Sequence, residues 1–304
     1  MRRYRERLAE ETGRNPMRAL IILAGLISAA LMPSSAFAWG DVGHRVICQI
    51  AYEELKPEIR ARVDALVAID PKFRTFADGC TWPDVFPRQR SPEHYVDLPR
   101  SAKGIEVAHP CPVADRCVIS AILNDTRDLA LSLDVSDQLR LLKSLGHWVG
   151  DVHQPLHVSF DDDRGGNLVA IAGPCRLNLH ATWDNCIIEK KIGRDYAEIA
   201  ANLRAEVTDE DRARWVPPII DTAAVVAWAN ESSAIAEKPD VQYCVQKNDA
   251  CWYATDQEQY RGGTQRVVTV DDAYLTAQAA TVRERLKMAG VRLGAILNTA
   301  LVPG

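Results

Sequence analysis

The chain has 304 residues, of which 47% are apolar and 25% are charged, and its formal net charge is −5 at neutral pH. This length suits one large domain or two modest ones, and the composition excludes a disordered chain. The negative charge also excludes a protein that grips duplex nucleic acid through a broad basic surface.

Residues 1–38 have the three parts of an export signal. Six arginines precede an apolar stretch of 14 residues at 19–32, and Ala-Phe-Ala at 36–38 supplies the small residues of a cleavage site. A bilayer span needs roughly 20 apolar residues, which disfavours a membrane anchor. We therefore expect cleavage after Ala38, a single mature domain at 39–304 with a net charge of −8, and a secreted or periplasmic protein without stable membrane association.

Eight cysteines support the same location. None of them forms a C-x-x-C pair, so the sequence gives no support to zinc–thiolate or thioredoxin-type motifs, and an even number in an exported chain suggests disulfides. Spacing alone does not determine the connectivity. Pairing near neighbours gives our expectation, which is Cys48–Cys80, Cys111–Cys117, Cys175–Cys186 and Cys244–Cys251.

Helical periodicity dominates the rest of the chain. The predicted helices are 41–55, 57–69 with Pro57 in the first turn, 117–133, 136–153 with Ser136 as N-cap and Pro155 after its end, and segments near 180–191, 195–206, 219–237 and 272–299. The residues at 70–116 read as a long functional loop, and those at 161–174 as a short hairpin or an extended loop. The expected fold is an all-α, single-domain helical bundle with long loops and at most a short β-hairpin.

Two histidines are each followed by an aspartate four residues later. In a helix, His147 and Asp151, and likewise His180 and Asp184, lie on one face, where each pair could form half of a zinc site. The alternatives are a surface ion pair or a buried, hydrogen-bonded histidine, and a structural role of this kind is expected for His153. Apolar flanks place the first pair near a buried face, where such groups are costly unless a cation neutralises them.

Six short motifs together resemble those of the type I nuclease family, whose members carry three clustered zinc ions and cut single-stranded nucleic acid. The motifs occur in family order as WGDVGHR, TWPD, HYVD, LGHWVGDVHQPLH, RGGN and LHATWD. WANES and AGVRLGAILN match the carboxy-terminal half more loosely, so the resemblance runs from 39 to about 298. The chain is also similar, more distantly, to the zinc-dependent phospholipases C.

The resemblance implies nine ligands for three zinc ions, including the free amine and carbonyl oxygen of the first mature residue. The implied sets are Asp84, His94, His147 and Asp151 for one ion, Trp39, His44 and the shared Asp151 for a second, and His157, His180 and Asp184 for a third. An α-amine binds zinc only when it is free and deprotonated. Leader cleavage before Trp39 would therefore activate the enzyme, which is a hypothesis that comparing Trp39-initiated protein with a chain one residue longer would test.

Further residues are candidates for catalysis and substrate binding. Asp97 would orient or deprotonate the attacking water, and Arg100 would steady the phosphate, with a structural ion pair as its alternative. Arg88, four residues after Asp84, is another candidate cation. Asn167 follows two glycines that permit a close backbone approach and would reach the substrate, with a plain turn as the alternative.

These features predict a zinc-dependent phosphodiesterase that cleaves single-stranded DNA and RNA to 5′-phosphate products, with removal of 3′-phosphates from mononucleotides as a further activity. We expect a monomer whose substrates are single-stranded nucleic acid or nucleotides. A phospholipase C is the nearest alternative, against which Asp184 stands where those enzymes typically have glutamate. A non-catalytic exported zinc-binding protein is the other alternative, and a metalloprotease is disfavoured because no H-E-x-x-H motif occurs.

Overall fold

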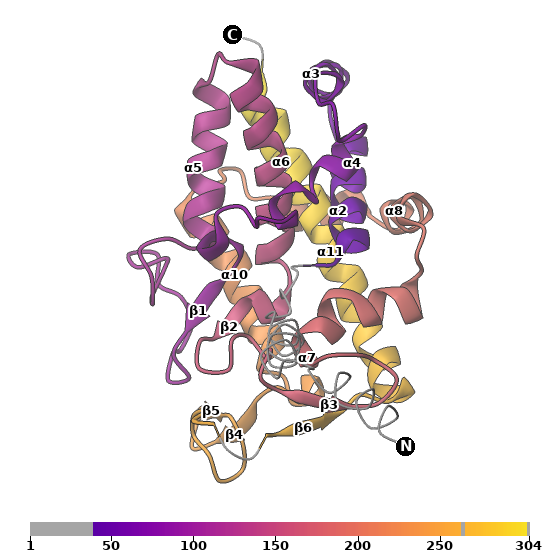
Figure 1. Ribbon diagram of the computed structural model, residues 1–304. Coiled ribbons are helices and arrows are strands. Elements are labelled where there is room, and N and C mark those ends of the chain that lie inside the picture. The colour runs from indigo at the N-terminus through magenta and orange to yellow at the C-terminus, as the bar shows by residue number, and fades with distance from the viewer. Residues whose placement is uncertain (1–38, 263–264, 303–304) are drawn as a thin grey trace, which may run out of the picture. The chain divides into compact units, whose positions relative to one another are not determined.

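The structure is a computed structural model that describes residues 39–262 and 265–302, so the predicted export signal lies outside the described residues. Helices make up most of this part of the chain, and its strands form three small two-stranded sheets (Figure 1). The all-α prediction is therefore confirmed. Among the described residues, no helix combines the length and the apolar character that a bilayer crossing requires.

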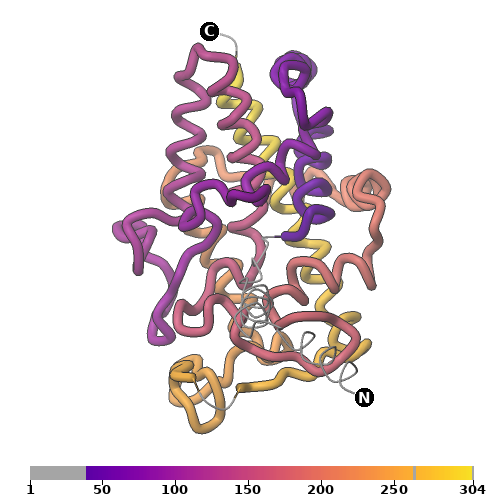
Figure 2. Tube along the Cα trace, viewed as in Figure 1, coloured from indigo at the N-terminus to yellow at the C-terminus, as the bar shows by residue number. Residues whose placement is uncertain are grey.

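Five long helices surround the apolar core. They are α2 (Asp41–Glu53), α5 (Val118–Leu131), α6 (Val135–Val152), α10 (Thr222–Ala236) and α11 (Asp272–Ala300). Figure 2 shows α2 and α11 side by side, although they come from opposite ends of the domain. Their close approach depends on small residues, because a Cβ added to Gly290 would lie 2.5 Å from the Ile50 side chain.

Shorter helical segments connect these five. The α-helices are α3 (Pro57–Ala68), α4 (Phe76–Gly79), α7 (Leu179–Ala181), α8 (Tyr196–Ala205) and α9 (Asp209–Trp215), and α7 continues through the π-helical turns η5 (Thr182–Cys186) and η6 (Ile188–Ile192). Single 3₁₀ turns form η2 (Trp82–Asp84), η3 (Ser91–His94), η4 (Pro155–His157) and η7 (Pro239–Val241). Several of these short turns carry the side chains described below.

The sheets join segments that are distant in sequence. β1 (Val96–Leu98) pairs in parallel with β2 (Val158–Phe160), and β3 (Ala170–Ala172) pairs in parallel with β6 (Val267–Thr269). The one hairpin in the described residues is β4 (Val245–Lys247) with β5 (Ala250–Trp252). No hairpin forms at 161–174, where turns precede β3, so the extended-loop alternative holds.

The capping of α6 differs from the prediction. Its N-cap is Asp134 rather than Ser136, because the Asp134 carboxylate accepts hydrogen bonds from the backbone N–H of Ser136 and of Asp137, both at 2.9 Å. The helix ends at Val152, before Pro155, as predicted. The short helix α9 was not predicted, and a capping box between Thr208 and Asp211 begins it.

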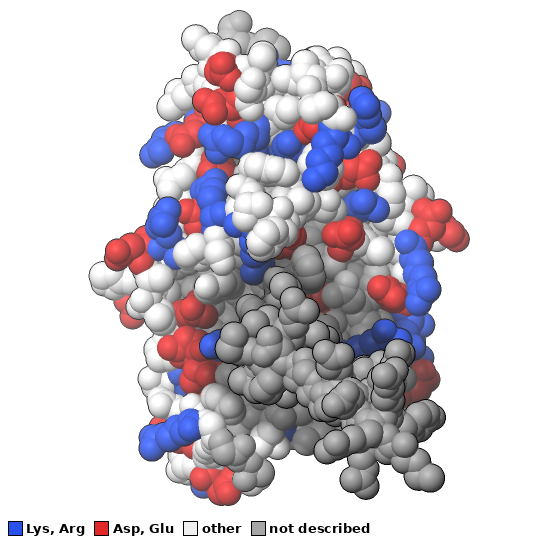
Figure 3. Space-filling model, in the orientation of Figure 1, with Lys and Arg blue, Asp and Glu red and all other residues white. Residues whose placement is uncertain are grey.

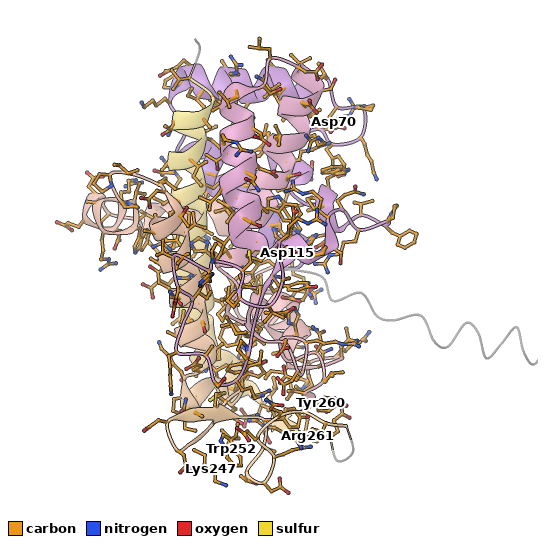
Figure 4. All side chains as sticks on the ribbon, turned by 90° about the vertical axis from the view of Figure 1, so that its left-hand side faces the viewer. Asp70, Asp115, Lys247, Trp252, Tyr260 and Arg261 are labelled. Carbon is orange, nitrogen blue, oxygen red and sulfur yellow. A yellow bond between two sulfur atoms is a disulfide. The ribbon has the colours of Figure 1, made fainter. Side chains whose placement is uncertain are left out.

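All four predicted disulfides are present, and no cysteine is free. Figure 4 draws the side chains of the described residues. The Cys48–Cys80 bridge has a particular position, because it ties α2 to the segment that leads into η2. Both of these elements contribute to the site described next.

Candidate metal centre

The eight predicted side-chain ligands all lie on helices or single helical turns. They are His44 on α2, Asp84 at the end of η2, His94 at the end of η3, His147 and Asp151 on α6, His157 at the end of η4, His180 on α7 and Asp184 on η5. Helical turns fix the direction of each side chain relative to the core, and the histidines among them are at least 95% buried.

The structure brings these side chains together into three groups. Within each group, one possible ligand atom per residue lies within 4.8 Å of the others, and the groups are His44–His147–Asp151, Asp84–His94–His147 and His157–His180–Asp184. Asp151 lies between them, since its Oδ1 is 3.5 Å from His44 Nε2 and its Oδ2 is 3.2 Å from His94 Nδ1. Three adjoining groups therefore form one candidate centre.

Backbone carbonyls fix the protonation of the histidine rings. The Nδ1 of His147 lies 2.8 Å from the Cys80 carbonyl oxygen, and the Nδ1 of His180 lies 2.7 Å from that of Gly165. A carbonyl oxygen can only accept, so each Nδ1 carries the proton and each Nε2 keeps a lone pair. His157 follows the same pattern, with Nδ1 2.7 Å from the His94 carbonyl oxygen.

The remaining ring nitrogens face one another in pairs. His94 directs its Nε2 to the Gln89 carbonyl oxygen at 2.9 Å, so its Nδ1 keeps the lone pair, and that atom lies 3.1 Å from His147 Nε2. His157 Nε2 and His180 Nε2 lie 3.2 Å apart in the same way. Two lone pairs at this distance repel unless a cation lies between them. Burial lowers the pKa of His94 and of His157 well below its ordinary value, which disfavours a proton and favours a metal ion.

The carboxylate of Asp151 also lacks a partner that would stabilise it. Both carboxylate oxygens are buried without a hydrogen-bond partner, and so are both ring nitrogens of His44. Burial raises the pKa of Asp151 well above its usual range, and the negative charge of Asp84 adds to this effect. Burying an ionised carboxylate without a partner costs several kcal/mol, which a coordinated cation would offset.

The spacing of the donor atoms fits zinc. Tetrahedral coordination with Zn–N distances of about 2.0–2.1 Å places neighbouring donors roughly 3.3 Å apart. Donor atoms at this centre lie from 3.1 Å apart, for His147 Nε2 and His94 Nδ1, to 3.8 Å apart, for His157 Nε2 and Asp184 Oδ1. Imidazole nitrogens and carboxylate oxygens, without thiolates, are ligands that suit Zn²⁺.

Trp39, the first described residue, lies next to this centre. Its side chain is fully buried, and its Nε1–H donates to the Gly150 carbonyl oxygen at 2.8 Å, one residue before Asp151. The next backbone N–H, that of Gly40, donates to the Asp184 carbonyl oxygen at 2.9 Å. Trp39 and Gly40 therefore contact α6 and η5, which carry ligands of different groups.

Gln154 and Arg88 support the ligands. The Gln154 Nε2–H donates to Asp184 Oδ1 at 2.6 Å, and the Arg88 Nε–H donates to Asp84 Oδ1 at 3.0 Å. Burial is the main cause of the lowered pKa of His147, and the charge of Arg88 adds to it. Gln154 was not among the predicted site residues, although its place between His153 and His157 was a signal in the sequence.

The two candidate catalytic residues have different surroundings. Asp97 lies half-buried on β1, where burial and the negative charge of Asp161 raise its pKa to about 6. Arg100 is buried, and its guanidinium donates to Asp162 at 2.8 Å and to Asp163 at 2.6 Å, outside the three groups. These contacts favour the structural ion pair for Arg100.

Asn167 also lies outside the three groups. Its side chain donates to the Arg164 carbonyl oxygen at 2.8 Å and accepts from Asn178 at 3.2 Å. Gly165, two residues before Asn167, supports the centre, because its carbonyl oxygen accepts from His180 at 2.7 Å. A side chain is excluded there, since Gly165 has φ +62° and a Cβ would lie 2.5 Å from the Leu156 carbonyl oxygen. His153 is fully buried between the Val149 carbonyl oxygen and Arg292, which fits its expected structural role.

Comparison with known proteins agrees with this geometry. A family profile described as S1/P1 nuclease matches residues 39–302, which include every residue of the centre. Endonuclease 4 of Arabidopsis thaliana is 33% identical over 308 residues, covering 92% of each chain. Nuclease S1 of Aspergillus oryzae is 29% identical over 195 residues, covering 60% of this chain and 67% of that protein, and nuclease P1 of Penicillium citrinum is 25% identical over 164 residues, covering 51% and 60%. The chain belongs to the S1/P1 nuclease family, as the six motifs predicted.

Proposed function

We propose that this protein is a zinc-dependent phosphodiesterase that cleaves single-stranded DNA and RNA to 5′-phosphate products, and that the same site removes 3′-phosphates from mononucleotides. Family membership supports hydrolysis of phosphodiester bonds within nucleic acid. Two pairs of facing ring nitrogens, His94 with His147 and His157 with His180, carry the metal assignment. A cation between them would relieve the repulsion of their lone pairs, whereas burial, which lowers the pKa of His94 and of His157, disfavours a proton there.

We assign three zinc ions to the centre. Asp84, His94, His147 and Asp151 would hold one, Trp39, His44 and the shared Asp151 a second, and His157, His180 and Asp184 the third. Bound zinc supplies a water-derived nucleophile at neutral pH and Lewis-acid stabilisation of the phosphate. The protein holds each ligand ring in one tautomer and keeps the donor atoms close together.

The amine of Trp39 is part of this assignment. Cleavage after Ala38 would free it beside α6, so that leader removal completes the second site. Four disulfides suit a chain that folds in an oxidising compartment, either secreted or periplasmic. We take the active form to be a monomer without stable membrane association.

Arg88 and Asp97 would act on the substrate. Burial raises the pKa of Tyr95, the charge of Asp97 adds to this and the charge of Arg88 opposes it. Arg88 contacts a metal-site carboxylate, whereas Arg100 is held in its own ion pairs. We therefore give Arg88 the task of steadying the phosphate and Asp97 that of accepting the proton of the attacking water.

Asn167 remains a proposed substrate contact. Its neighbour Asn178 caps α7 by accepting from the Ala181 N–H at 2.8 Å, so the Asn167 amide is one hydrogen bond away from the turn that carries His180. A phosphate or sugar held at the third ion would lie near this side of the centre.

The surface charge is consistent with attraction by bound metal rather than by protein cations. On the face drawn in Figure 3, coloured basic and acidic side chains are interspersed. Three divalent ions would add six positive charges to a mature chain whose expected net charge is −8.

Elemental analysis and a single-strand nuclease assay, before and after chelation, test this function. We expect about three zinc ions per chain, turnover of single-stranded DNA and RNA, loss of both on chelation, and recovery of both when zinc is added. Phosphatidylcholine turnover without nucleic-acid cleavage would indicate a phospholipase C instead. Full zinc content without any phosphodiester turnover would indicate a non-catalytic zinc-binding protein.

A further inference from the structure

Arg90 has an unusual backbone conformation next to the metal centre. Its φ and ψ are both 48°, in the left-handed region that residues other than glycine rarely adopt. Such residues persist only where their surroundings hold them, and they cluster at functional sites. Gln89, the residue before it, supplies the carbonyl oxygen that accepts from His94 Nε2 at 2.9 Å. The strained residue therefore adjoins the backbone group that orients a proposed ligand.

An ion pair ties the Arg90 side chain to α5. Its Nη1 donates to both carboxylate oxygens of Asp125, at 2.8 and 2.6 Å. The side chains of Asp125 and Arg90 are 4% and 28% exposed, so solvent screens this pair less than it screens a surface pair. Glu93, inside η3, forms a second ion pair with the same guanidinium. Because Arg90 directly precedes η3, these contacts fix the start of the turn that carries His94.

Asp125 also connects this ion pair to α6. Its Oδ2 accepts from Trp148 Nε1 at 2.9 Å, and Trp148 is fully buried directly after His147. The Trp148 ring meets the ring of His94 edge-on, with 4.6 Å between centroids, and the Arg90 guanidinium lies 5.4 Å above the same indole. One carboxylate thus joins α5, α6 and η3 around the ring of His94.

A competing tautomer is available to the neutral ring of His94. Its Nδ1 lies 3.2 Å from Asp151 Oδ2 and 3.1 Å from His147 Nε2, and both atoms are acceptors. A proton on Nδ1 instead of Nε2 would form a hydrogen bond there and would occupy the lone pair that a metal ion needs. The Gln89 carbonyl oxygen opposes this tautomer, because it stabilises the proton on Nε2. The position of that carbonyl therefore decides whether the ring is a ligand or a hydrogen-bond donor.

We propose that Arg90 is a positioning residue for His94. Its ion pair with Asp125 holds the Gln89 carbonyl in place, which keeps the proton on Nε2 of the ring and leaves Nδ1 free for a metal ion. Histidines that bind metals commonly donate their other ring N–H to such a group, and loss of that support weakens metal binding. The inference rests on the proposed function for the bound ion, whereas the tautomer itself needs no ion.

The tautomer can be measured in the metal-free protein. Proton–nitrogen correlation NMR spectra of the chelated mature chain, at a pH where the ring is neutral, distinguish the protonated ring nitrogen from the unprotonated one, and His94→Asn assigns the signals. We expect wild-type His94 to carry its proton on Nε2, and Arg90→Gln to shift it toward Nδ1. Asp125→Asn keeps the size of the side chain and an acceptor for Trp148, so it should cause the same shift by removing the ion pair alone.

Zinc affinity gives a second measurement. In competition with a chelator of known affinity, Arg90→Gln should weaken the binding of one of the three ions roughly 10–100-fold. Arg90→Lys retains a cation that can reach Asp125, so it should recover most of this loss and restore the wild-type tautomer.

Arg212→Gln is the matched control. The Arg212 side chain is 31% exposed and donates to the Glu54 carboxylate at 2.8 and 2.9 Å, without contacting the metal centre. This variant should lose thermal stability but keep the wild-type tautomer of His94 and the wild-type zinc affinity. If Arg90→Gln and Asp125→Asn behave in the same way as this control, the positioning role is overturned. A wild-type chain that binds no zinc would instead overturn the function on which the inference rests, whatever the tautomer.

Discussion

Replacement of Asp151 by asparagine should make the zinc-loaded protein less stable and the metal-free protein more stable. The change keeps the size of the side chain and removes the carboxylate that we assign to two of the three zinc sites, which lies 3.5 Å from His44 Nε2 and 3.2 Å from His94 Nδ1. An amide oxygen is a poor substitute for a bridging carboxylate, so we expect zinc content to fall from three ions to one. Strand cleavage, to which we assign the two ions that share Asp151, should fall to background.

The magnitudes follow from the surroundings of Asp151. A ligand present at 100 times its Kd stabilises a fold by about 2.7 kcal/mol per site, so losing two sites removes about 5 kcal/mol from the zinc-loaded protein. Without zinc, the wild-type carboxylate lies 3.2 Å from His94 Nδ1 and 3.3 Å from His147 Nε2, two atoms that cannot donate to it. An asparagine amide can donate to either, so the metal-free variant should be more stable than metal-free wild type by about 1–3 kcal/mol.

Thermal unfolding with and without a chelator, at fixed protein concentration, measures both effects. Asp70→Asn is the control, because Asp70 (labelled in Figure 4) is also buried but accepts from Lys143 at 2.6 Å and contacts no ligand group. That variant should lose stability equally in both conditions. The reasoning about Asp151 is refuted if its variant keeps three zinc ions, or if it is the less stable protein after chelation.

Three other changes test the assigned roles. A chain that begins at Trp39 should hold one zinc ion more than a chain that retains Ala38, and should be the more active, because the extra peptide bond removes the lone pair of the amine; equal zinc and equal activity would contradict this. Arg88→Gln should lower kcat on single-stranded DNA by about 10²–10³-fold at unchanged zinc content, with partial recovery in Arg88→Lys. Asp97 accepts a proton only when ionised, and its pKa is raised to about 6, so wild-type kcat should rise with pH through about 6 and then level off. Asp97→Asn should be about 10²–10⁴-fold slower and lack that rise, and a pH–rate profile of unchanged shape would exclude this role.

The helices and their ligand faces were predictable because their signals are local. The spacing of four residues places His147 and Asp151 on one face, and the structure has both on α6 within 3.3 Å of each other. Near-neighbour pairing of the cysteines also succeeded, since short loops lose the least entropy on closure. Both inferences depend on distances along the chain that a folded helix or loop preserves.

Contacts between distant loops were not predictable in the same way. Arg88 and Arg100 are each within four residues of a proposed site acid, and the sequence does not distinguish them. The structure does, because Arg100 meets Asp162 and Asp163, more than 60 residues away. The parallel pairs β1–β2 and β3–β6 were not predicted either, because three residues are too few to show the alternating hydrophobic pattern of a strand or to indicate its pairing partner.

Protein groups, rather than a metal ion, orient three of the histidine rings at the centre. His147, His157 and His180 each donate to a backbone carbonyl, and those carbonyls belong to segments held by the Cys48–Cys80 bridge, by the pairing of β1 with β2 and by the Gly165 turn. None of these restraints needs a metal ion. These protein contacts orient three of the five histidine rings of the centre. Two unfavourable features remain at the centre, which are the repulsion between facing lone pairs and the burial of the Asp151 and Asp184 carboxylates. A bound cation would relieve both, and this gain in free energy would favour metal binding.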